Sequence, residues 1–388
     1  MSDTMWALTF DAAREDWATS TGLVKERVPV PHLTDPAGAH AQSALVRVKY
    51  AGFCGSDRGI WWRKAFGDLI LGSLAEEGRT KRVVGHEMLG EIVEAGHEVA
   101  AAFDLHVGDV VSTESHIICG TCYQCQRGET HVCTREKIIG ISRDGCFAEY
   151  IQLPAKALWK TDLGAIRPEV GAMQEPFGNA VHACQVTELR DRTVAIVGCG
   201  TIGLFAIMIA KGMGARKVIG VEVEPRNAAL ALKLGADVVL APKAQGQPHQ
   251  SDPSLRDTIL DLTDGVGADV SLEMAGFNNA LNNAVKITRR GGHVVLFGVK
   301  NGDVTVEDYH RIVMSGLTLH AVVGRRIFQT WEITKRLLED RSNGIQAAMY
   351  ETILNGGVGT ISDIETWTPA GFEALMAAHP KGLIRFAG

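Results

Sequence analysis

Four cysteines that lie within fifteen residues are the first feature of this sequence that could carry chemistry. They are Cys119, Cys122, Cys125 and Cys133, with the spacing C-x2-C-x2-C-x7-C. This spacing lets a tight loop turn four thiolates onto one tetrahedral ion, and zinc is the natural occupant. An iron–sulfur cluster is the alternative, although the common ferredoxin patterns have other spacings and a proline after the last ligand. Because four thiolates saturate zinc, we expect a structural site, and the chemistry must lie elsewhere.

A second set of metal-binding side chains is spread along the chain. Cys54 lies in "GFCGSD", His86 and Glu87 lie in "VVGHEMLG", and Glu175 lies in "MQEPFGNAVH". A thiolate, an imidazole and a carboxylate, with one position left for water or substrate, make an open zinc site. Taken singly, a lone cysteine or histidine is more often a buried core residue than a ligand. The set gains weight only together with the motif described next.

That motif is a glycine-rich turn, "VAIVGCGTIG", which joins an apolar strand to an apolar helix expected over 202–213. Gly198, Gly200 and Gly203 make the turn tight and let the backbone approach a pyrophosphate at the helix N-terminus. Glu222 stands at the end of the next strand, where a carboxylate binds ribose hydroxyls and repels a 2′-phosphate, which favours NAD over NADP. Arg226 is a nearby cation that could instead serve a phosphate. A glycine-rich turn in an unrelated sheet is the alternative.

The secondary-structure elements that must position these groups follow two different patterns along the chain. Short β-type runs broken by glycine predict an antiparallel, barrel-like domain, and they are expected at 44–50, 88–95, 109–112 and 147–153. From Arg192, apolar strands alternate with helical segments, which predicts βαβ units and a parallel sheet. Its strands are expected at 194–197, 218–221, 238–240, 270–273, 294–299 and 317–323.

These patterns predict that the chain is divided into three segments. Residues 1–177 form the first domain, with the cysteine loop at 119–133, and residues 178–320 form the parallel-sheet domain. Residues 321–388 contain a helix expected over 328–341 and short strand-like pieces, too little for a third core, so they are expected to pack back on the first domain.

Composition limits the classes of partner. The chain has 388 residues, 46% of them hydrophobic, and a formal net charge of −6, which gives no long-range attraction to nucleic acid or anionic lipid. Neither is expected as a partner. The N-terminus "MSDTMWALTF" has no basic region before its apolar run, so we expect no signal peptide and a cytoplasmic location. Eight cysteines in that compartment indicate metal binding or catalysis rather than disulfides.

Together these motifs resemble the zinc-dependent medium-chain dehydrogenase/reductase family over nearly the whole chain. The stretches "EPFGNAVHA", "GCFAEY", "LEMAG" and "GRRIFQTW" are most similar to the members that oxidise L-threonine. The resemblance implies an α/β protein with a GroES-like β-barrel catalytic domain and a doubly wound Rossmann domain. It also implies one catalytic and one structural zinc per chain, NAD as coenzyme, and a homotetramer.

The resemblance also assigns roles to single residues. The catalytic residues that it implies are Cys54, Ser56, His86, Glu87, His116 and Glu175, with Cys54, His86 and Glu87 as metal ligands and Glu175 as an exchangeable ligand or close neighbour of the ion. Ser56 would take the proton of the alcohol, although its plain alternative is a turn serine, and His116 would line the substrate pocket. The further coenzyme-contacting positions are Ile202, Phe297, Gly298, Val299, Val322 and Val323. One departure is Gly59, where the family commonly has a proton-relaying histidine.

The reaction implied is oxidation of a secondary alcohol to a ketone with hydride transfer to NAD, on L-threonine or a similar amino alcohol. A polyol or sugar is the alternative substrate class. From a different class, a non-catalytic coenzyme-binding protein on the same scaffold is the third hypothesis, against which the chain retains Cys54, His86 and Glu87.

Overall fold

The computed structural model describes residues 3–300 and 302–386, so residues 1–2, 301 and 387–388 of the predicted segments lie outside the described residues. The chain divides into two compact units. The first unit consists of Met1–Pro176 and Arg326–Gly388, and the second of Phe177–Arg325. The first unit is therefore built from two stretches that are far apart in the sequence.

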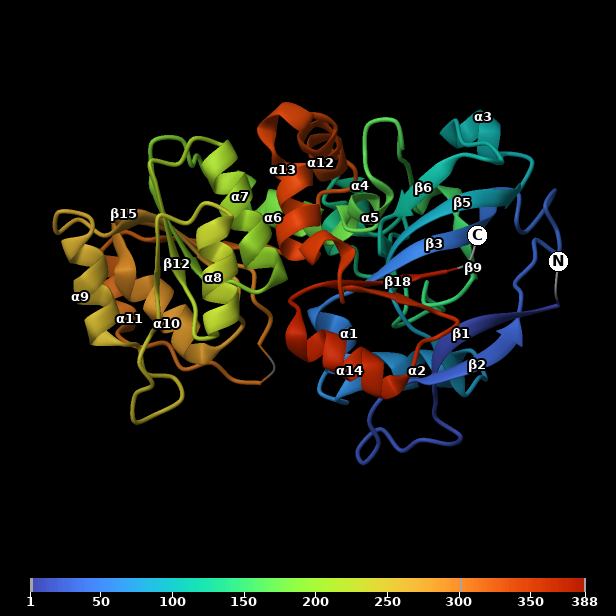
Figure 1. The fold of residues 1–388 in the computed structure, drawn as a ribbon, viewed down its shortest axis with the longest axis horizontal. Coiled ribbons are helices and arrows are strands. Elements are labelled where there is room, and N and C mark those ends of the chain that lie inside the picture. The colour runs from blue at the N-terminus through green and yellow to red at the C-terminus, as the bar shows by residue number, and fades with distance from the viewer. Residues whose placement is uncertain (1–2, 301, 387–388) are drawn as a thin grey trace. The chain divides into compact units, whose positions relative to one another are not determined.

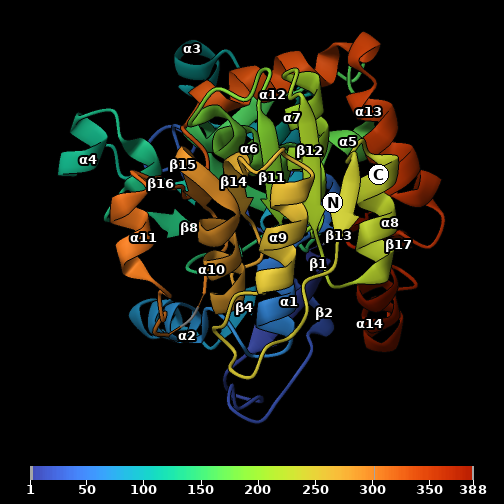
Figure 2. The same ribbon diagram turned by 90° about the vertical axis from the view of Figure 1, so that its left-hand side faces the viewer.

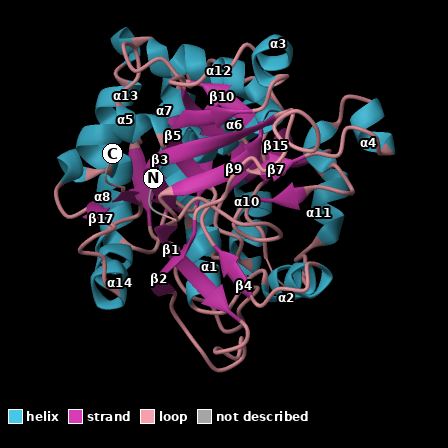
Figure 3. Cartoon of the chain, turned by 90° about the vertical axis from the view of Figure 1, so that its right-hand side faces the viewer, coloured by secondary structure: helices cyan, strands magenta, loops and turns pink. Residues whose placement is uncertain are grey.

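The first unit is mainly β-structure (Figures 1 and 3). A seven-stranded sheet has the order β10-β6-β5-β3-β18-β17, with β9 pairing with β3, and a three-stranded sheet has the order β2-β1-β4. Its strands are β1 Thr4–Asp11, β2 Val24–Pro29, β3 Ser43–Phe53, β4 Lys81–Val83, β5 Glu87–Ala95, β6 Val110–Thr113, β9 Tyr150–Pro154, β10 Leu158–Lys160, β17 Ile361–Asp363 and β18 Gly382–Arg385, with the hairpin β7 His116–Ile117 and β8 Lys137–Ile138.

Strand β3 shows why this sequence forms a sheet with one buried face. Ala44, Val46 and Val48 are fully buried and alternate with the half-buried Arg47 and Lys49. From Val46 to Lys49 this two-residue period places one face in the core and leaves the other polar, whereas Leu45, beside a register shift, is fully buried as well. The strand pairs antiparallel with β5, β9 and β18, so it anchors most of the unit.

The helices of the first unit are short and lie mostly between strands. They are α1 Gly55–Trp61, α2 Gly67–Glu76, α3 Val99–Phe103, α4 Tyr123–Gln126, α5 Pro168–Gly171, α12 Gln329–Glu339, α13 Ile345–Ala348 and α14 Pro369–Ala378, with 3-10 turns at Thr130–Val132, Ala155–Ala157, Arg341–Asn343 and Asn355–Gly357 and a π turn at Met349–Ile353. Helix α6, Gln174–Gln185, begins in the first unit. Among the described residues, no helix is both long and apolar enough to cross a bilayer.

The C-terminal stretch is tied to the first unit by a strand and by a buried tryptophan. Strand β18 pairs antiparallel with the end of β3, with Gly382 opposite Phe53. A Cβ on Gly382 would overlap Leu375 and Phe53, so glycine is required by this close approach. Trp331 on α12 is 1% exposed, and its indole N–H donates to Glu114 Oε2 at 2.8 Å.

The second unit is a doubly wound parallel sheet (Figure 2). The strand order is β13-β12-β11-β14-β15-β16, and every pairing is parallel. Its strands are β11 Thr193–Val197, β12 Lys217–Val221, β13 Val238–Leu240, β14 Ala268–Glu273, β15 Thr288–Leu296 and β16 Thr318–Ala321; its helices are α7 Thr201–Gly212, α8 Pro225–Lys233, α9 Pro253–Asp261, α10 Asn278–Ile287 and α11 Tyr309–Met314. The order reverses between β11 and β14, which is where such sheets bind ligands.

The predicted fold class is confirmed, and the bounds of several strands are corrected. The strand expected at 147–153 spans Tyr150–Pro154, and the strand expected to begin at 294 begins at Thr288. The strand expected at 294–299 ends at Leu296, because the backbone N–H groups of Phe297 and Gly298 both donate to the carbonyl of Glu273 at 3.0 Å and turn the chain out of the sheet. The strand expected at 317–323 spans only Thr318–Ala321.

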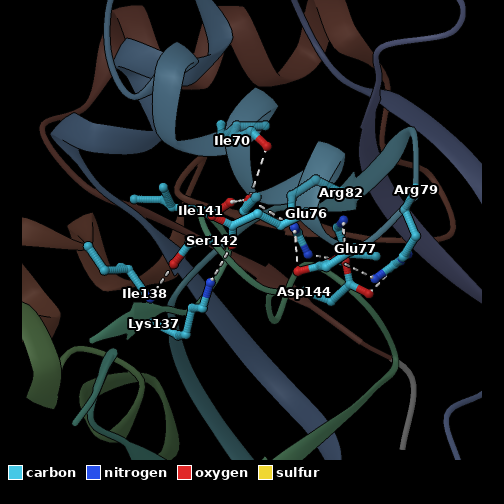
Figure 4. A network of polar contacts seen from close by, with 12 residues as sticks. Ile70, Glu76, Glu77, Arg79, Arg82, Lys137, Ile138, Ile141, Ser142 and Asp144 are labelled. Atoms are coloured by element: carbon cyan, nitrogen blue, oxygen red, sulfur yellow. Dashed lines mark hydrogen bonds and ion pairs between the residues drawn. The ribbon is translucent and has the colours of Figure 1, made fainter. Parts of the chain in front are cut away.

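A polar network fastens α2 to β4 and to the loop at residue 144 (Figure 4). Arg82 is fully buried, and its guanidinium donates to Ser73 Oγ at 3.0 Å, Glu77 Oε1 at 2.9 Å and Asp144 Oδ1 at 3.3 Å. Arg79 binds the same two carboxylates, but its side chain is 45% exposed.

This pair of arginines offers a stability test with a matched control. Arg82→Ala removes a buried side chain and three hydrogen bonds, so we expect a loss of about 3 kcal/mol. Arg79→Ala breaks ion pairs that water already screens, and its loss should stay below about 1 kcal/mol. Scanning calorimetry of the two variants checks the order. Equal falls in melting temperature would contradict the importance of the buried guanidinium.

Candidate functional site

Helix α1 fixes the first metal-binding side chain. Cys54 is its N-cap, and a capping box forms in which Sγ accepts from the third helical N–H while Asp57 Oδ2 accepts from the Cys54 N–H at 2.9 Å. The thiol is therefore held by the same contacts that begin the helix. Ser56, in the first turn, places its Oγ 2.5 Å from Cys54 Sγ.

His86 arrives from the loop before β5 and faces the thiol. Its Nε2 lies 3.1 Å from Cys54 Sγ and 3.2 Å from Ser56 Oγ, while its Nδ1 lies 3.7 Å from Asp57 Oδ1. A carboxylate behind the second ring nitrogen is the usual arrangement for a metal-binding histidine. Gly85 has φ +88° and packs against the Phe147 ring, so the tight approach that aims His86 requires glycine.

Glu87, the first residue of β5, forms a buried ion pair with Lys381. Both side chains are fully buried, and Lys381 Nζ binds Glu87 Oε2 and donates to the carbonyl of Phe53 at 2.9 Å. The other carboxylate oxygen, Oε1, is buried without a hydrogen-bond partner among the described residues. A Cβ on Gly52 would overlap Glu87 Oε2, so a glycine there leaves room for the pair.

These residues fit zinc. The ligand atoms of Cys54, His86 and Glu87 all lie within 4.8 Å of one another, and a thiolate, an imidazole and a carboxylate are zinc ligands. Burial raises the pKa of the Cys54 thiol and Asp57 raises it further, although His86 opposes them, so a thiolate here needs a cation. The unpaired Glu87 Oε1 needs one as well.

Glu175 and His116 lie outside this set of three. Glu175 is 3% exposed in the first turn of α6, and its Oε1 accepts from Ser115 Oγ at 2.7 Å. Burial lowers the pKa of His86, and the charge of Glu175 is one of several that raise it. Burial raises the pKa of Glu87, and the charge of Glu175 raises it further. His116 Nδ1 lies 2.8 Å from Glu136 Oε2.

The four loop cysteines form a second, self-contained cluster. Their sulfurs lie within 4.8 Å of one another, with Cys122 and Cys133 at 3.8 Å. Backbone N–H groups of Thr121 and Cys122 point at Cys119 Sγ. The Thr121 N–H contributes most to lowering the pKa of Cys119 to about 5, against the opposing effect of burial. The loop therefore favours a thiolate at Cys119 before any ion binds, whereas burial raises the pKa of Cys125 to about 12. The four sulfur donors together suit one tetrahedral zinc.

In the second unit, the three glycines of the turn differ in their surroundings. Gly198 has φ +97° and a Cβ there would meet Ala275, while a Cβ on Gly203 would overlap the carbonyl of Gly198. Around Gly200, the N-cap of α7, nothing lies within 4 Å of a built Cβ. Two glycines thus close the turn and the third leaves open space at a helix N-terminus, as a pyrophosphate requires.

Glu222 is engaged by this turn more fully than the sequence suggests. Its Oε2 accepts from the Cys199 N–H at 2.7 Å, and its Oε1 accepts from the N–H groups of Val223 and Glu224 at 2.8 Å. Three of about four lone-pair positions are used, so one is left for a ribose hydroxyl rather than two. Glu222 can therefore accept fewer hydrogen bonds from the ribose hydroxyls of a coenzyme than a free carboxylate could.

The remaining predicted coenzyme positions follow the carboxyl ends of strands or open α7. Phe297, Gly298 and Val299 follow β15, and Val322 and Val323 follow β16. Val299 is 85% exposed and Val323 44%, whereas Ile202, in the first turn of α7, is half-buried and Val322 is buried. Parallel sheets bind ligands at this edge.

Several residues of these sites were not predicted. Asp57 could have been found, since an acid three residues after an N-cap indicates a capping box. Glu273, whose Oε1 accepts from the N–H groups of Ala275 and Gly276 at 2.8 Å, is the last residue of the strand expected at 270–273. Ser115, Glu136 and Lys381 carry no local signal, because their partners are distant in sequence.

Two family models match this chain. The alcohol dehydrogenase GroES-like domain matches residues 40–163, and the zinc-binding dehydrogenase model matches residues 201–340. An L-threonine 3-dehydrogenase of Pyrococcus horikoshii is 37% identical over 76% of this chain and 79% of its own length. The chain belongs to the zinc-binding dehydrogenase family. The expected resemblance and the expected enzyme class, a zinc-dependent alcohol dehydrogenase, are confirmed.

Other members of the zinc-binding dehydrogenase family agree with this assignment. An L-threonine 3-dehydrogenase of Symbiobacterium thermophilum is 36% identical over 80% of this chain and 81% of its own length. The solved structure of alcohol dehydrogenase TADH from Thermus sp. ATN1 superimposes with a TM-score of 0.79 at 25% identity, covering 99% of this chain and all of that one.

Zinc content tests both clusters. We expect two zinc ions per chain of this dehydrogenase and one in Cys54→Ser, with loss of turnover, because the substitution removes a ligand of the dispersed set. Atomic absorption on dialysed protein measures this. Two ions surviving in Cys54→Ser would contradict the assignment of Cys54.

The matched control is Cys122→Ser, in the loop. It should also leave one zinc ion, but with a lower melting temperature, because a saturated four-thiolate site contributes directly to folding. A melting temperature that falls in Cys54→Ser and not in Cys122→Ser would reverse the two assignments.

Proposed function

We propose that this dehydrogenase oxidises the secondary hydroxyl of L-threonine, or of a closely similar amino alcohol, to a ketone with NAD. The observation that carries the proposal is the convergence of Cys54, His86 and Glu87 in a chain whose family relatives include L-threonine 3-dehydrogenases. A thiolate and a carboxylate on one dication leave the centre neutral, which suits binding of an alcohol.

Cys54, His86 and Glu87 would hold the catalytic zinc, and Glu175 would be its near neighbour. When bound, zinc polarises the alcohol oxygen and lowers the pKa of the hydroxyl. Asp57 fixes the site from behind, since it accepts from the Cys54 backbone and faces His86 Nδ1. Lys381 holds one oxygen of Glu87, and the other, buried without a hydrogen-bond partner among the described residues, would bind the ion.

Ser56 would receive the proton of the alcohol. Its hydroxyl can accept and donate at once, and it lies within hydrogen-bond distance of both Cys54 Sγ and His86 Nε2. Gly59 cannot be replaced there by a relaying histidine, since a Cβ would lie 2.7 Å from the Ala65 Cβ. His116, paired with Glu136 and 19% exposed, is the candidate for the next step toward solvent.

The coenzyme would bind at Gly198, Gly200 and Gly203, with Glu222 at its ribose. Bound NAD supplies the acceptor for the hydride. Glu222 remains a carboxylate beside the ribose position, and its charge repels a 2′-phosphate even with three oxygen sites occupied. The residues that follow β15 and β16, Phe297, Gly298, Val299, Val322 and Val323, would contact the rest of the coenzyme, and of these Val299 and Val323 are exposed.

The proposal also covers the domain boundaries, the cellular location and the oligomeric state. By the family resemblance, residues 1–177 form the catalytic domain, 178–320 the NAD-binding domain and 321–388 the return segment, in a cytoplasmic homotetramer. Light scattering coupled to size-exclusion chromatography tests the tetramer.

The substrate assignment is tested by initial rates with NAD on L-threonine, 3-hydroxybutyrate, sorbitol and glucose. We expect kcat/KM for L-threonine to exceed that for sorbitol by at least about a hundredfold, since a site that pairs the carboxylate and ammonium of threonine would reject a ligand that lacks them. 3-Hydroxybutyrate, which lacks the ammonium group, should fall between them. Equal or better activity on sorbitol would instead show that the enzyme is a polyol dehydrogenase.

The coenzyme assignment is tested by Glu222→Gln, which keeps the shape and removes the charge. We expect the preference for NAD over NADP, as a ratio of kcat/KM values, to fall about tenfold or more. Glu224→Gln, at an exposed neighbouring residue, is the control and should keep the wild-type ratio. A ratio unchanged in Glu222→Gln would remove Glu222 from coenzyme selection.

A further inference from the structure

A cavity of about 460 Å³ lies within the first unit, away from the residues assigned so far. It is bounded by β1, β2, β4, β9 and the loop at residues 143–145. None of Cys54, His86, Glu87 or Glu175 is among the described residues that line it. Its volume is in the range that holds a small molecule.

The lining has more basic than acidic side chains. Arg27, Arg79, Lys81, Arg82 and Arg143 face two acids, Glu77 and Asp144. Four of the five cations already have carboxylate partners. Arg79 and Arg82 pair with Glu77 and Asp144, Lys81 Nζ lies 2.8 Å from Glu26, and Arg27 Nη1 lies 3.4 Å from Glu149.

Arg143 is the exception. Its Nη2 donates to the carbonyl of Gln152 at 2.9 Å, and among the described residues no carboxylate oxygen lies within 4.0 Å of its guanidinium. The adjacent Asp144 is committed to Arg79, Arg82 and the Val83 N–H. The Nε of Arg143 is buried and unpaired.

The charge of this guanidinium is partly buried and has no carboxylate within ion-pair distance among the described residues. Burial lowers the pKa of Arg143, and Arg82 adds to the effect while Asp144 opposes it. An arginine stays protonated under these conditions, so the cost of burial is not relieved by losing the proton. A bound anion relieves it by pairing with the charge.

The rest of the cavity selects the kind of anion. Met5, Val28, Pro29, Val83 and Ile151 supply apolar surface beside the cation. Among the described lining residues, Arg143 is the one cation without a carboxylate within ion-pair distance, so a singly charged head group matches the site better than a dianionic phosphate. We propose that this cavity is a binding site for a small organic monocarboxylate, whose carboxylate pairs with Arg143 and whose apolar body lies against Val28, Val83 and Ile151.

The test is isothermal titration calorimetry on the zinc-loaded enzyme with hexanoate as the probe. Hexanamide, the neutral analogue of the same shape, is the second probe, and inorganic phosphate is the third. We expect saturable 1:1 binding of hexanoate at this site, with hexanamide and phosphate at least about tenfold weaker, since a charge-assisted pair is lost or mismatched. Hexanamide binding as tightly as hexanoate would overturn the proposal without any variant.

Variants locate the site. Arg143→Gln should weaken hexanoate about tenfold or more, while Arg190→Gln, an exposed arginine of the second unit, should leave binding unchanged. Arg143→Lys keeps the charge and should bind with an intermediate affinity. Hexanoate affinity that is equal in wild type and folded Arg143→Gln would place the carboxylate elsewhere and refute the assignment. The outcome is independent of the alcohol substrate, because turnover is not the readout.

Discussion

The buried ion pair between Lys381 and Glu87 is the contact on which the candidate metal centre depends most. Both side chains are fully buried, and burying either charge alone would cost several kcal/mol. The pair can form only when β18, near the C-terminus, lies against the end of β3, because Lys381 directly precedes that strand and also donates to the Phe53 carbonyl. The carboxylate of Glu87 therefore gains its ammonium partner only from the part of the chain that follows the second unit.

The ion pair with Lys381 also gives the two oxygens of the Glu87 carboxylate different roles. Lys381 occupies Glu87 Oε2, whereas Oε1 is buried without a donor, so one oxygen is structural and the other is available to a cation. Around it stand a thiol and two further acids, Asp57 and Glu175, whose charges act on the same site. One ammonium group offsets part of that negative charge without competing for both oxygens. The Gly52 position, where a Cβ would overlap the carboxylate, shows how closely the backbone is fitted to this arrangement.

The sequence predicted what is encoded locally. Four cysteines in one loop, three glycines in one turn and the alternation of apolar strands with helices all act within a few tens of residues, and the parallel sheet and the cysteine cluster appear where they were expected. Lys381 could not be found this way, since it meets Glu87 across 294 positions. The strand expected at 294–299 was drawn too long for a related reason: its apolar pattern continues, but the Glu273 carbonyl captures two backbone N–H groups and ends the pairing. The engagement of Glu222 by three backbone donors was equally invisible, because a pattern names the acid and not its partners.

The two cysteine-containing centres consequently stand in different relations to the fold. The loop cluster gathers its sulfurs and their N–H donors from residues 119–133, so a local segment can assemble it once zinc is present. The dispersed set takes its ligands from a helix cap, a loop residue and the first residue of a strand, and a lysine from the last part of the chain holds the carboxylate. A contact of such sequence separation forms only after a large loss of chain entropy. The candidate catalytic centre of this chain is therefore supported by a long-range contact from the C-terminal stretch, whereas the cysteine cluster is assembled from one loop.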